Sequence, residues 1–458
     1  MENQRESGMK ERKKRRVILF PLPLQGHINP MLQLANILYD KGLSITVIHT
    51  NFNSPNSSNY PHFHFCSIPD GLLELGASSS DVVALTTHLN VNCVVPFRDC
   101  LDKLLSNVEE EESTACLITD AACHFTHAVA DSLNLPRIVL RTSSIASLLA
   151  FAATSLLHEK GYFPIEDLGS EAPMPEFPSL RVKDIPLIHT QDEENFYQLL
   201  ISMITQIKAS SGLIWNSFQE LEQDTLKTLE HDFRIPIFTI GPFHKYLPAS
   251  SSSLLSQDTS SISWLDKQAP KSVLYVSFGS IVAFNETEFL EIAWGLAGSG
   301  VPFLWVVRPG LIRGYEWLEP LPKGFLEKLD GRAHIVKWAP QQEVLAHPAT
   351  GGFWTHNGWN STLESICEGV PMICQPCFGD QLVNARYVSH IWRVGLHLEN
   401  RLKRGEIERV IRRVILEAEG KEMRDRIMDL KKKVDVSLRQ GGSAYQSLES
   451  LISYIESF

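Results

Sequence analysis

The sequence predicts an α/β protein made of two doubly wound domains, each with a parallel sheet, that face each other across a cleft. The chain has 458 residues, more than one compact core usually holds. A strand–helix–strand pattern starts near residue 17, and a second one starts near residue 272. A serine-rich stretch, 246–261, separates them and is the predicted linker. The predicted domains therefore comprise residues 1–245 and 262–440.

The first pattern opens with Val17–Phe20, an apolar run typical of a strand buried on both faces of a sheet. Asn29 is predicted to cap the following helix, with Pro30 at its first helical position, and Gly42 is predicted to end it. A second apolar run begins at Ile45. Because a helix joins the two strands, they are expected to be parallel with a right-handed crossover.

The second pattern opens with Ser272–Phe278 and returns to a strand at Phe303–Val307. The helix between them starts at a predicted capping box, Asn285–Glu288, in which two side chains satisfy each other's backbone N–H groups. Folds of this kind bind ligands at the carboxyl ends of their strands, so we expect the chemistry in the cleft. The predicted buried face of this helix consists of Phe289, Ile292, Ala293 and Leu296.

Composition and charge point to a globular protein with small-molecule partners. Hydrophobic residues make up 43% of the chain and charged residues 21%. The formal net charge of -11 argues against binding to nucleic acid or to an anionic membrane, which requires clustered cations.

The N-terminal segment and the cysteines predict the compartment. Residues 1–15 carry a basic run, but Pro21 and Pro23 interrupt the apolar stretch that follows, so we expect a flexible arm and not a signal peptide. No stretch is long and apolar enough to be a transmembrane helix. The eight cysteines are scattered and are expected to stay reduced. The sequence thus predicts a cytoplasmic protein, and we expect a monomer.

The strongest local signal runs from Trp338 to Gln381. Within it, Gly352–Thr355 predicts a buried strand, and the residues after His356 predict a turn into a helix that ends near Gly369. The unpaired N–H groups at the start of such a helix form an anion site, which a diphosphate would fit. Polar side chains around this turn can add donors to the phosphates: His356, Asn360 and Ser361.

Other side chains of this stretch suit the remaining parts of a nucleotide sugar. Trp338 follows a predicted strand and offers an aromatic face on which a base can stack. Glu364 could accept hydrogen bonds from ribose hydroxyls, while Asp380 and Gln381 could bracket the hydroxyls of a sugar.

This stretch resembles, nearly position for position, the signature of plant secondary-product UDP-glycosyltransferases, which are inverting enzymes of the GT-B type with two Rossmann-like domains. The resemblance extends to Gly26–Pro30 and Ser277–Ser280. It implies that the N-terminal domain binds the acceptor and the C-terminal domain the nucleotide sugar. It also implies that 441–458 form a helix packed back on the first domain. The sequence is most similar to the subgroup with diterpene-glycoside, flavonoid and cytokinin glucosyltransferases.

The resemblance assigns roles in binding a UDP-sugar, the implied co-substrate, with no permanently bound cofactor. A terminal glutamine is associated with glucose in this family, while UDP-xylose or another UDP-sugar remains an alternative. The implied uracil and ribose contacts are Trp338, Ala339, Gln341 and Glu364; the diphosphate contacts are Ser280, His356, Asn360 and Ser361, in the turn with Asn357 and Gly358; and the sugar contacts are Thr142, Trp359, Asp380 and Gln381.

Two residues of the first domain are the predicted catalytic pair. His27 follows the first strand, and Asp120 ends the apolar run that begins at Cys116, so both lie at the carboxyl edge of the sheet. A neutral imidazole can take the proton of an acceptor hydroxyl while the carboxylate orients it and stabilises its charged form. One direct displacement inverts the anomeric centre and gives a β-glycoside. The chain has no Asp-X-Asp sequence, so no metal is expected to be required.

Several alternative functions and sites fit the sequence less well. An NAD-dependent oxidoreductase would show Gly-X-Gly-X-X-Gly after the first strand, which is absent here. A non-catalytic sugar-nucleotide sensor would not need both His27 and Asp120, and a UDP-sugar epimerase would not need the plant signature. A zinc site formed by Asp120, His124 and His127 is a further possibility, but zinc sites are rarer than histidines that line a pocket. His124 is therefore predicted to line the acceptor site.

The acceptor is predicted to be lipophilic, such as a terpenoid, a flavonoid or another phenolic, and N-glycosylation of a cytokinin-like acceptor remains an alternative. The stretches expected to shape its pocket are mainly apolar or aromatic. They are Asp81–Phe97, Ala121–His127, Ser143–Tyr162 and Ile185–Ile204, with Phe97, Phe125, Phe151, Phe196 and Tyr197 as the aromatic members.

Overall fold

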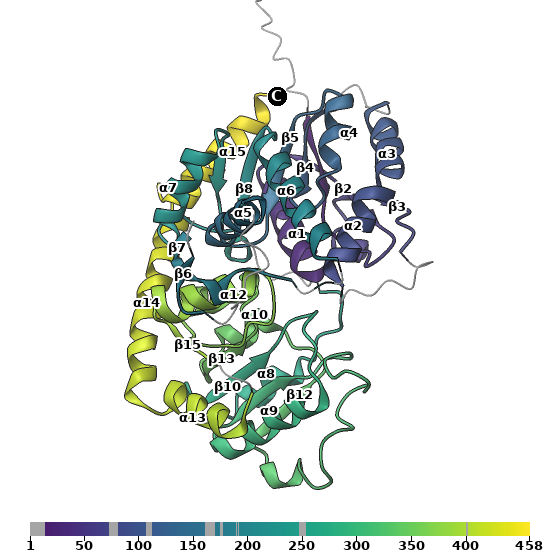
Figure 1. Cartoon of the computed structure of the whole chain (residues 1–458). Coiled ribbons are helices and arrows are strands. Elements are labelled where there is room, and N and C mark those ends of the chain that lie inside the picture. The colour runs from purple at the N-terminus through teal and green to yellow at the C-terminus, as the bar shows by residue number, and fades with distance from the viewer. Residues whose placement is uncertain are drawn as a thin grey trace, which may run out of the picture.

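The computed structural model describes residues 14–72, 81–106, 112–160, 170–174, 177–188, 190, 192–246, 253–399 and 402–458. It contains two large parallel sheets, one in each half of the chain, with helices packed around them (Figure 1). Most of the predicted N-terminal arm, residues 247–252 of the predicted linker, and Tyr162 lie outside the described residues.

The first sheet has seven parallel strands in the order β3-β2-β1-β4-β5-β8-β9. The strand order reverses between β1 and β4, which is where doubly wound sheets open a crevice for ligands. Its strands are β1 (Lys14–Phe20), β2 (Ser44–Thr50), β3 (His64–Ile68), β4 (Glu112–Asp120), β5 (Arg137–Arg141), β8 (Gly212–Trp215) and β9 (Ile237–Thr239).

Helices cover both faces of this sheet, and a small hairpin lies beside it. The hairpin pairs β6 (Pro173–Met174) with β7 (Phe177–Arg181). The helices of this half are α1 (Gln25–Asp40), α2 (Val82–Asn92), α3 (Val94–Ser106), α4 (Thr126–Ser132), α5 (Ile145–Glu159), α6 (Glu193–Lys208) and α7 (Gln223–Asp232), with short turns η1 (Ser57–Asn59), η2 (Val182–Asp184) and η3 (Phe243–Lys245).

The second sheet has six parallel strands in the order β12-β11-β10-β13-β14-β15, and its order reverses between β10 and β13. Its strands are β10 (Val273–Ser277), β11 (Phe303–Val306), β12 (Ala333–Val336), β13 (Thr350–Thr355), β14 (Met372–Cys374) and β15 (Gly395–His397). The helices are α8 (Ser260–Leu265), α9 (Glu286–Ser299), α10 (Gln341–Ala346), α11 (Trp359–Glu368), α12 (Asp380–Arg386), α13 (Arg404–Ile415), α14 (Ala418–Leu438) and α15 (Ser443–Glu456), with turns η4 (Glu327–Leu329) and η5 (Tyr387–Ile391).

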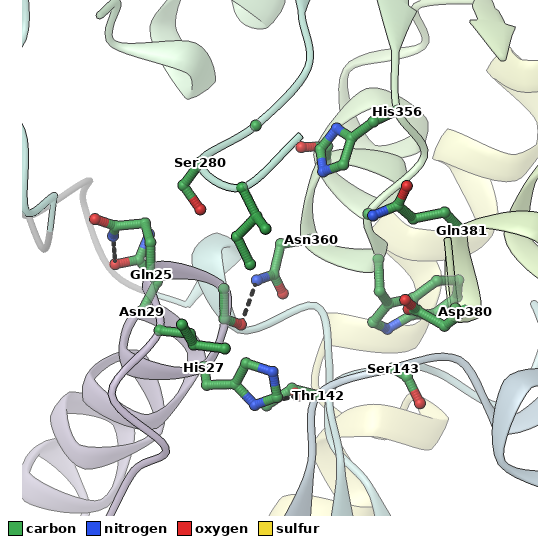
Figure 2. A pocket seen from close by; sticks show the side chains of 18 of the residues that line it. Gln25, His27, Asn29, Thr142, Ser143, Ser280, His356, Asn360, Asp380 and Gln381 are labelled. Carbon is green, nitrogen blue, oxygen red and sulfur yellow. Dashed lines mark hydrogen bonds between the residues drawn. The ribbon is translucent and has the colours of Figure 1, made fainter. Parts of the chain in front are cut away.

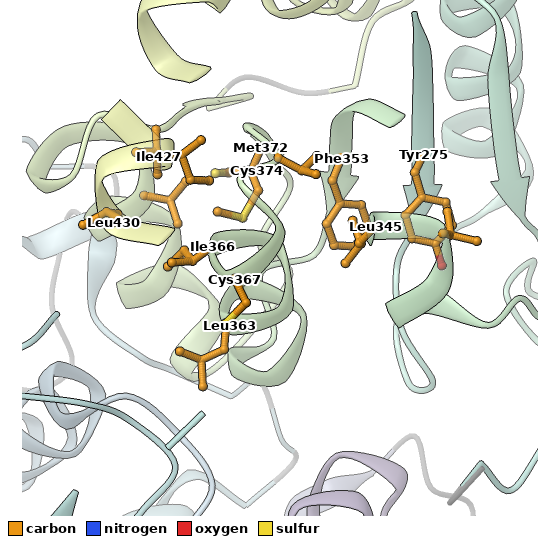
Figure 3. Packing of buried hydrophobic residues seen from close by; sticks show 14 of the residues in the cluster. Tyr275, Leu345, Phe353, Leu363, Ile366, Cys367, Met372, Cys374, Ile427 and Leu430 are labelled. Atoms are coloured by element: carbon orange, nitrogen blue, oxygen red, sulfur yellow. The ribbon is translucent and has the colours of Figure 1, made fainter. Parts of the chain in front are cut away.

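A buried cluster fixes α11 on the second sheet (Figure 3). Tyr275 of β10 stacks on Phe353 of β13, with ring centroids 4.9 Å apart. Leu363 and Ile366 of α11 are fully buried in the same cluster, together with Ile427 of α14. Burying such side chains contributes roughly 1.5–3 kcal/mol each, so the first turn of α11 is held at a defined place above the strand ends.

The predicted start of the α9 helix is confirmed. The Glu288 N–H donates to Asn285 Oδ1, and the Asn285 N–H donates to Glu288 Oε2, both at 2.9 Å. These reciprocal bonds form the capping box. The four residues predicted for the buried face of this helix are all buried.

The predicted start of the first helix is wrong. Helix α1 begins at Gln25, so Pro30 lies inside it and Asn29 does not cap it. The Asn29 side chain instead accepts a hydrogen bond from Gln25. A proline in a helix leaves the carbonyl four residues earlier without its donor. Here that carbonyl belongs to Gly26, and the second domain supplies the donor.

The first strand is also longer than predicted. Lys14 and Arg15, assigned to the flexible arm, pair with Glu112 and Ser113 of β4. Arg15 Nη1 donates to Ser113 Oγ at 3.0 Å, and Arg16 donates to Thr114 and to a backbone carbonyl of α3. These contacts with β4 and α3 hold the start of β1 in the sheet.

The chain crosses between its two halves a second time through α14 and α15. In Figure 1 these yellow helices run along one side of both halves. Three residues of α15, Leu448, Leu451 and Ile455, are buried in the core that α1 shares with the first sheet. Tyr454 adds a hydrogen bond of 2.6 Å from its hydroxyl to the Ser211 carbonyl.

No helix in the described part of the chain is both long enough and apolar enough to cross a membrane. The cytoplasmic location and the monomeric state stay predictions.

Candidate active site

A cavity of about 480 Å³ lies between the carboxyl ends of the two sheets, at the points where both strand orders reverse. Figure 2 shows side chains from both halves of the chain facing this space. Most of the predicted site residues line it: His27, Thr142, Ser280, Trp338, Ala339, Gln341, His356, Gly358, Trp359, Asn360, Ser361, Glu364, Asp380 and Gln381.

The predicted catalytic pair is in direct contact. His27 Nδ1 lies 2.7 Å from Asp120 Oδ2. The other oxygen, Asp120 Oδ1, accepts a hydrogen bond of 2.9 Å from the Ala122 N–H. Asp120 is 1% exposed, whereas the His27 side chain is 25% exposed and lines the cavity. The carboxylate therefore holds the Nδ1–H tautomer, which leaves Nε2 with a lone pair that can accept a proton.

Thr142 lies beside this pair, at the end of β5. Its Oγ1 is 3.1 Å from His27 Nδ1 (Figure 2). The side chain thus contacts the imidazole and lines the cavity, and its predicted contact with the sugar stays a prediction.

The side chains predicted to hold ribose form a connected network. Gln341 Nε2 donates to Glu364 Oε2 at 2.7 Å and to Ser361 Oγ at 2.9 Å. Gln342, which the sequence analysis missed, donates to Glu364 Oε1 at 3.0 Å. Burial raises the pKa of the Glu364 carboxyl, and the two glutamines counteract this by stabilising the ionised form. Glu364 is therefore presented as a fixed acceptor.

Trp338 is held with its indole at the cavity wall. Its Nε1 donates to Ser253 Oγ at 2.8 Å. The adjacent Ala339 is buried, and both residues lie in the loop between β12 and α10. This leaves a ring surface and a backbone edge for a flat, polar base.

The end of the cavity that is predicted to hold the diphosphate is formed by the start of α11, whose cap is Gly358. The first N–H groups of this helix lack intrahelical partners and favour an anion. His356 lies beside them, and its burial lowers its pKa to about 4, so the ring is neutral at pH 7. Gly279 has φ +70° and its position would place a Cβ 2.6 Å from the His356 ring. Only glycine therefore lets the loop with Ser280 approach this histidine so closely.

A buried arginine that the sequence analysis did not single out supports this loop. Arg308 donates from Nε to the Gly279 carbonyl at 2.9 Å and from Nη1 to Pro309 at 3.0 Å, and it also donates from Nη2 to the Val282 carbonyl. Burial lowers its pKa to about 10, so it remains charged at neutral pH. Its charge also helps to lower the pKa of His356.

Asp380 and Gln381 stand at the start of α12 and face the cavity. Gln381 Oε1 accepts from the Cys377 N–H at 2.9 Å, which turns the side-chain NH₂ group away from that loop. Nε2 of Gln381 makes no hydrogen bond within the described residues. Asp380 Oδ2 accepts from Asn384 at 3.2 Å. The pair thus offers one donor and one acceptor side by side.

Two predicted donor-site residues are placed differently from the rest. Asn357 does not line the cavity, because its backbone is left-handed, with φ 62°, and its side chain is fully buried. Trp359 touches the cavity, but its indole is 2% exposed and its Nε1 donates to the Asn216 carbonyl at 2.7 Å. The Trp359 side chain therefore belongs mainly to the contact between the two domains.

The predicted aromatic lining of the acceptor side is partly wrong. Phe151 and Phe196 line the cavity. Phe97 and Phe125 instead pack on Phe20 in the core, with ring centroids 4.7 and 5.9 Å from it. Tyr197 stacks on a histidine of α5. The apolar composition of these segments does not specify which of their aromatic residues pack in the core and which line the cavity.

The alternative zinc site receives no support from the described residues. His124 lines the cavity, as predicted, whereas His127 lies 3.2 Å from Asp131, one turn along α4. The described residues contain no group of three or more side chains of the ligating types that could hold a metal ion. That the reaction requires no metal stays a prediction.

Comparison with known proteins identifies the family. Residues 35–434 match the family model of UDP-glucoronosyl and UDP-glucosyl transferase. UDP-glycosyltransferase 76B1 of Arabidopsis thaliana is 56% identical over 442 residues, covering 96% of this chain and 98% of that protein. UDP-glycosyltransferase 76G1 of Stevia rebaudiana is 51% identical over 468 residues, covering 100% of both.

A solved structure confirms the predicted fold. The crystal structure of UDP-glucose: anthocyanidin 3-O-glucosyltransferase in complex with UDP superposes with a TM-score of 0.85 at 28% identity, covering 98% of this chain and 100% of that one. The two facing Rossmann-like domains are thus of the GT-B type. The chain belongs to the plant family 1 UDP-glycosyltransferases, in subfamily 76, and is an enzyme that transfers a sugar from a UDP-sugar to small acceptors.

Proposed function

We propose that this enzyme transfers glucose from UDP-glucose to a hydroxyl of a small, largely apolar acceptor in the cytoplasm, with inversion at the anomeric carbon. The observation that carries the proposal is the pairing of His27 with Asp120 at the cavity wall that faces the start of α11. A base and an anion site on opposite walls leave room between them for a sugar.

His27 acts as the general base. With Nδ1–H committed to Asp120, the unprotonated Nε2 takes the acceptor's hydroxyl proton as its oxygen attacks C1 of the sugar. The buried carboxylate then stabilises the imidazolium that forms, because opposite charges attract strongly where water is excluded.

The second domain holds the leaving group. The N-terminus of α11 and the neutral His356 offer N–H donors to the diphosphate, where negative charge develops as the bond to C1 breaks. Gln341 and Glu364 bind ribose, and Trp338 stacks on uracil. Since these groups carry the charge of the leaving UDP, the mechanism uses no metal.

Glucose is favoured by the pair at the start of α12. Gln381 Nε2 is free to donate to one sugar hydroxyl, while the Asp380 carboxylate accepts from its neighbour. A donor and an acceptor at fixed positions bind best those sugars whose neighbouring hydroxyls point toward both groups. UDP-glucose is therefore expected to give a higher kcat/KM than UDP-galactose or UDP-xylose, and an equal or reversed order in a direct comparison contradicts the choice of glucose.

The catalytic proposal is tested by separating proton transfer from nucleotide binding. His27→Ala is expected to reduce turnover by ~10²–10⁴-fold through loss of the base, and further if the acceptor is misplaced. Asp120→Asn is expected to reduce turnover strongly as well. Both variants should keep the rise in melting temperature that UDP gives the parent enzyme. Trp338→Ala is the matched control, since it should lose most of that rise.

Turnover is measured with EDTA present throughout. The double variant should be little slower than His27→Ala, because residues that act as a unit are not additive. Near-normal turnover in His27→Ala, or loss of the parent's activity in EDTA, contradicts the mechanism.

A further inference from the structure

A buried arginine that has no assigned role lines the acceptor side of the cavity. Arg141 is the last residue of β5, and its side chain is 6% exposed. Side chains alternate along a strand, so Arg141 lies on the same face as Val139, toward α5 and α6. The next residue, Thr142, contacts His27 Nδ1. The guanidinium is thus close to the catalytic base but on the side of the apolar acceptor wall.

The hydrogen-bonding capacity of Arg141 is largely unused. Its only hydrogen bond with a described residue runs from Nη1 to the sulfur of Met203 at 3.4 Å, and sulfur is a weak acceptor. Its guanidinium carbon lies 5.7 Å from the ring centroid of Phe151. Its Nε is buried without a hydrogen-bond partner. Leaving such donors unpaired in a water-poor site is costly.

A second buried arginine of the site provides the contrast. All three nitrogens of Arg308 donate to backbone carbonyls, and Arg308 does not line the cavity. Arg308 is therefore a structural cation, whereas Arg141 lines the cavity with donors still available.

The nearby carboxylates do not use these donors. Asp120 and Asp380 act on Arg141 through space and raise its pKa, while burial, the larger effect, lowers it. Asp120 is bonded to His27 and Ala122, and Asp380 to Asn384. Neither forms an ion pair with Arg141 in the part of the chain that the structure describes. A guanidinium keeps its charge even when buried, so the site retains one cation that can bind a further anion.

We propose that Arg141 binds a carboxylate of the acceptor, which makes the natural acceptor a hydroxy carboxylic acid. A guanidinium and a carboxylate match in a bidentate, charge-assisted pair. The rest of the acceptor lies on the apolar wall formed by Val83, Phe151, Phe196 and Leu200. This inference rests on the proposed function, because His27 must activate the acceptor's hydroxyl.

Glucose is transferred to the hydroxyl of the hydroxy acid, and its carboxylate takes no part in bond formation. The acceptor oxygen forms a bond to C1 of glucose, the bond between C1 and the diphosphate oxygen breaks, and UDP leaves with that electron pair. The hydroxyl proton moves to His27 Nε2. The carboxylate on Arg141 stays ionised and forms no bond, so the product is an O-glucoside and not a glucose ester.

The test compares matched acceptors that differ only in charge. The probes are 3-hydroxybenzoate, 3-(4-hydroxyphenyl)propanoate and 2-hydroxy-3-phenylpropanoate, each with its methyl ester. For each pair the ratio of kcat/KM for the acid to that for the ester is measured with UDP-glucose, and binding of each acid to the enzyme with UDP is measured by calorimetry. The ratio cancels any general loss of activity.

The parent is expected to bind at least one acid and to prefer it to its ester by roughly 10-fold or more. Arg141→Met keeps the side-chain volume but removes the charge, and it should lower the ratio roughly 10- to 100-fold. Arg141→Lys keeps the charge without the planar fork and should lower it less. Met203→Leu removes the sulfur contact but keeps the guanidinium, so its ratio should match that of the parent.

Three results overturn the inference: no acid binds to the parent with UDP, the parent prefers the esters, or Arg141→Met leaves the ratio unchanged. The first two need no variant, so they decide the matter even if Arg141→Met does not fold. The UDP-induced rise in melting temperature reports on folding. The proposed function fails by other results, a parent that UDP does not stabilise or a His27→Ala variant that keeps its turnover, and neither involves Arg141.

Discussion

Asn360 of the second domain donates a hydrogen bond of 2.9 Å from its side-chain amide to the backbone carbonyl of Gly26 in α1 (Figure 2). This carbonyl lacks a helical donor because Pro30, four residues later, has no N–H group. Gly26 precedes His27, the proposed base, and Asn360 belongs to the first turn of α11. The bond therefore connects the proposed diphosphate site to the backbone that carries His27.

The hydrogen bond from Asn360 should matter less for stability when residue 30 can donate to the Gly26 carbonyl itself. Asn360→Ala is expected to lower the free energy of unfolding by roughly 0.5–1 kcal/mol. In a Pro30→Ala background the new N–H of residue 30 can donate to Gly26, so the same change should cost clearly less. Denaturant unfolding of the parent, both single variants and the double variant measures this coupling. Strictly additive losses contradict the shared carbonyl.

Gln381 should act on the sugar through its NH₂ group. Gln381→Glu keeps the shape and the bond from the Cys377 N–H, but it replaces the free donor by a second carboxylate oxygen beside Asp380. The kcat/KM for UDP-glucose is expected to fall roughly 10- to 100-fold. The stabilisation by UDP alone should persist.

Gln375→Glu is the matched control for this substitution, since it makes the same change in the loop between β14 and α12 but not in the cavity wall. An equal loss of kcat/KM in both variants means that added negative charge, and not the lost donor, is responsible.

Glu222 should make stability decrease as the pH rises toward neutrality. This carboxylate is 3% exposed and accepts from Ser217 Oγ at 2.6 Å and from the Ala146 N–H at 3.1 Å. Burial, the main cause, raises its pKa from 4.5 to about 7. The folded state thus binds more protons than the unfolded state between these values, and the stability contributed below about pH 4.5 is lost as the pH rises through about 7.

The size of this effect follows from the pKa change, at about 1.4 kcal/mol per unit. Glu222→Gln carries no titrating group, so the stability of the parent relative to this variant should fall by roughly 3 kcal/mol between pH 4.5 and 8. Denaturant unfolding at several pH values measures it. A difference that stays constant or grows with pH contradicts the raised pKa.

Periodicity and local capping signals predicted the two parallel sheets and helix α9, because these depend on residues close in sequence. The start of α1 was mispredicted for the opposite reason. Pro30 favours the first turn of a helix, and only a donor from Asn360, 330 positions later, makes its place inside α1 acceptable. Similarly, Lys14 and Arg15 join β1 through partners on β4.

The candidate site was predicted best where its residues are contiguous in sequence. The stretch that carries Trp338, Glu364 and Gln381 was found through its spacing, and His27 and Asp120 through their places after strands. Arg141 was missed because an arginine at the end of a strand is usually solvated, and its burial becomes visible only when α5 and α6 pack on that face. The orientation of the Gln381 amide depends on a loop backbone that the sequence does not specify.

The position of α15 has a consequence for biosynthesis. Leu448, Leu451 and Ile455 complete the core around α1, yet the ribosome adds them after the whole second sheet and its helices. The first sheet, although synthesised first, therefore keeps part of one apolar face uncovered until translation is nearly finished. Domains usually fold as units in the order of synthesis, and exposed apolar faces attract chaperones. In this enzyme the half that contains the second sheet can mature first, and the half that carries His27 becomes native last.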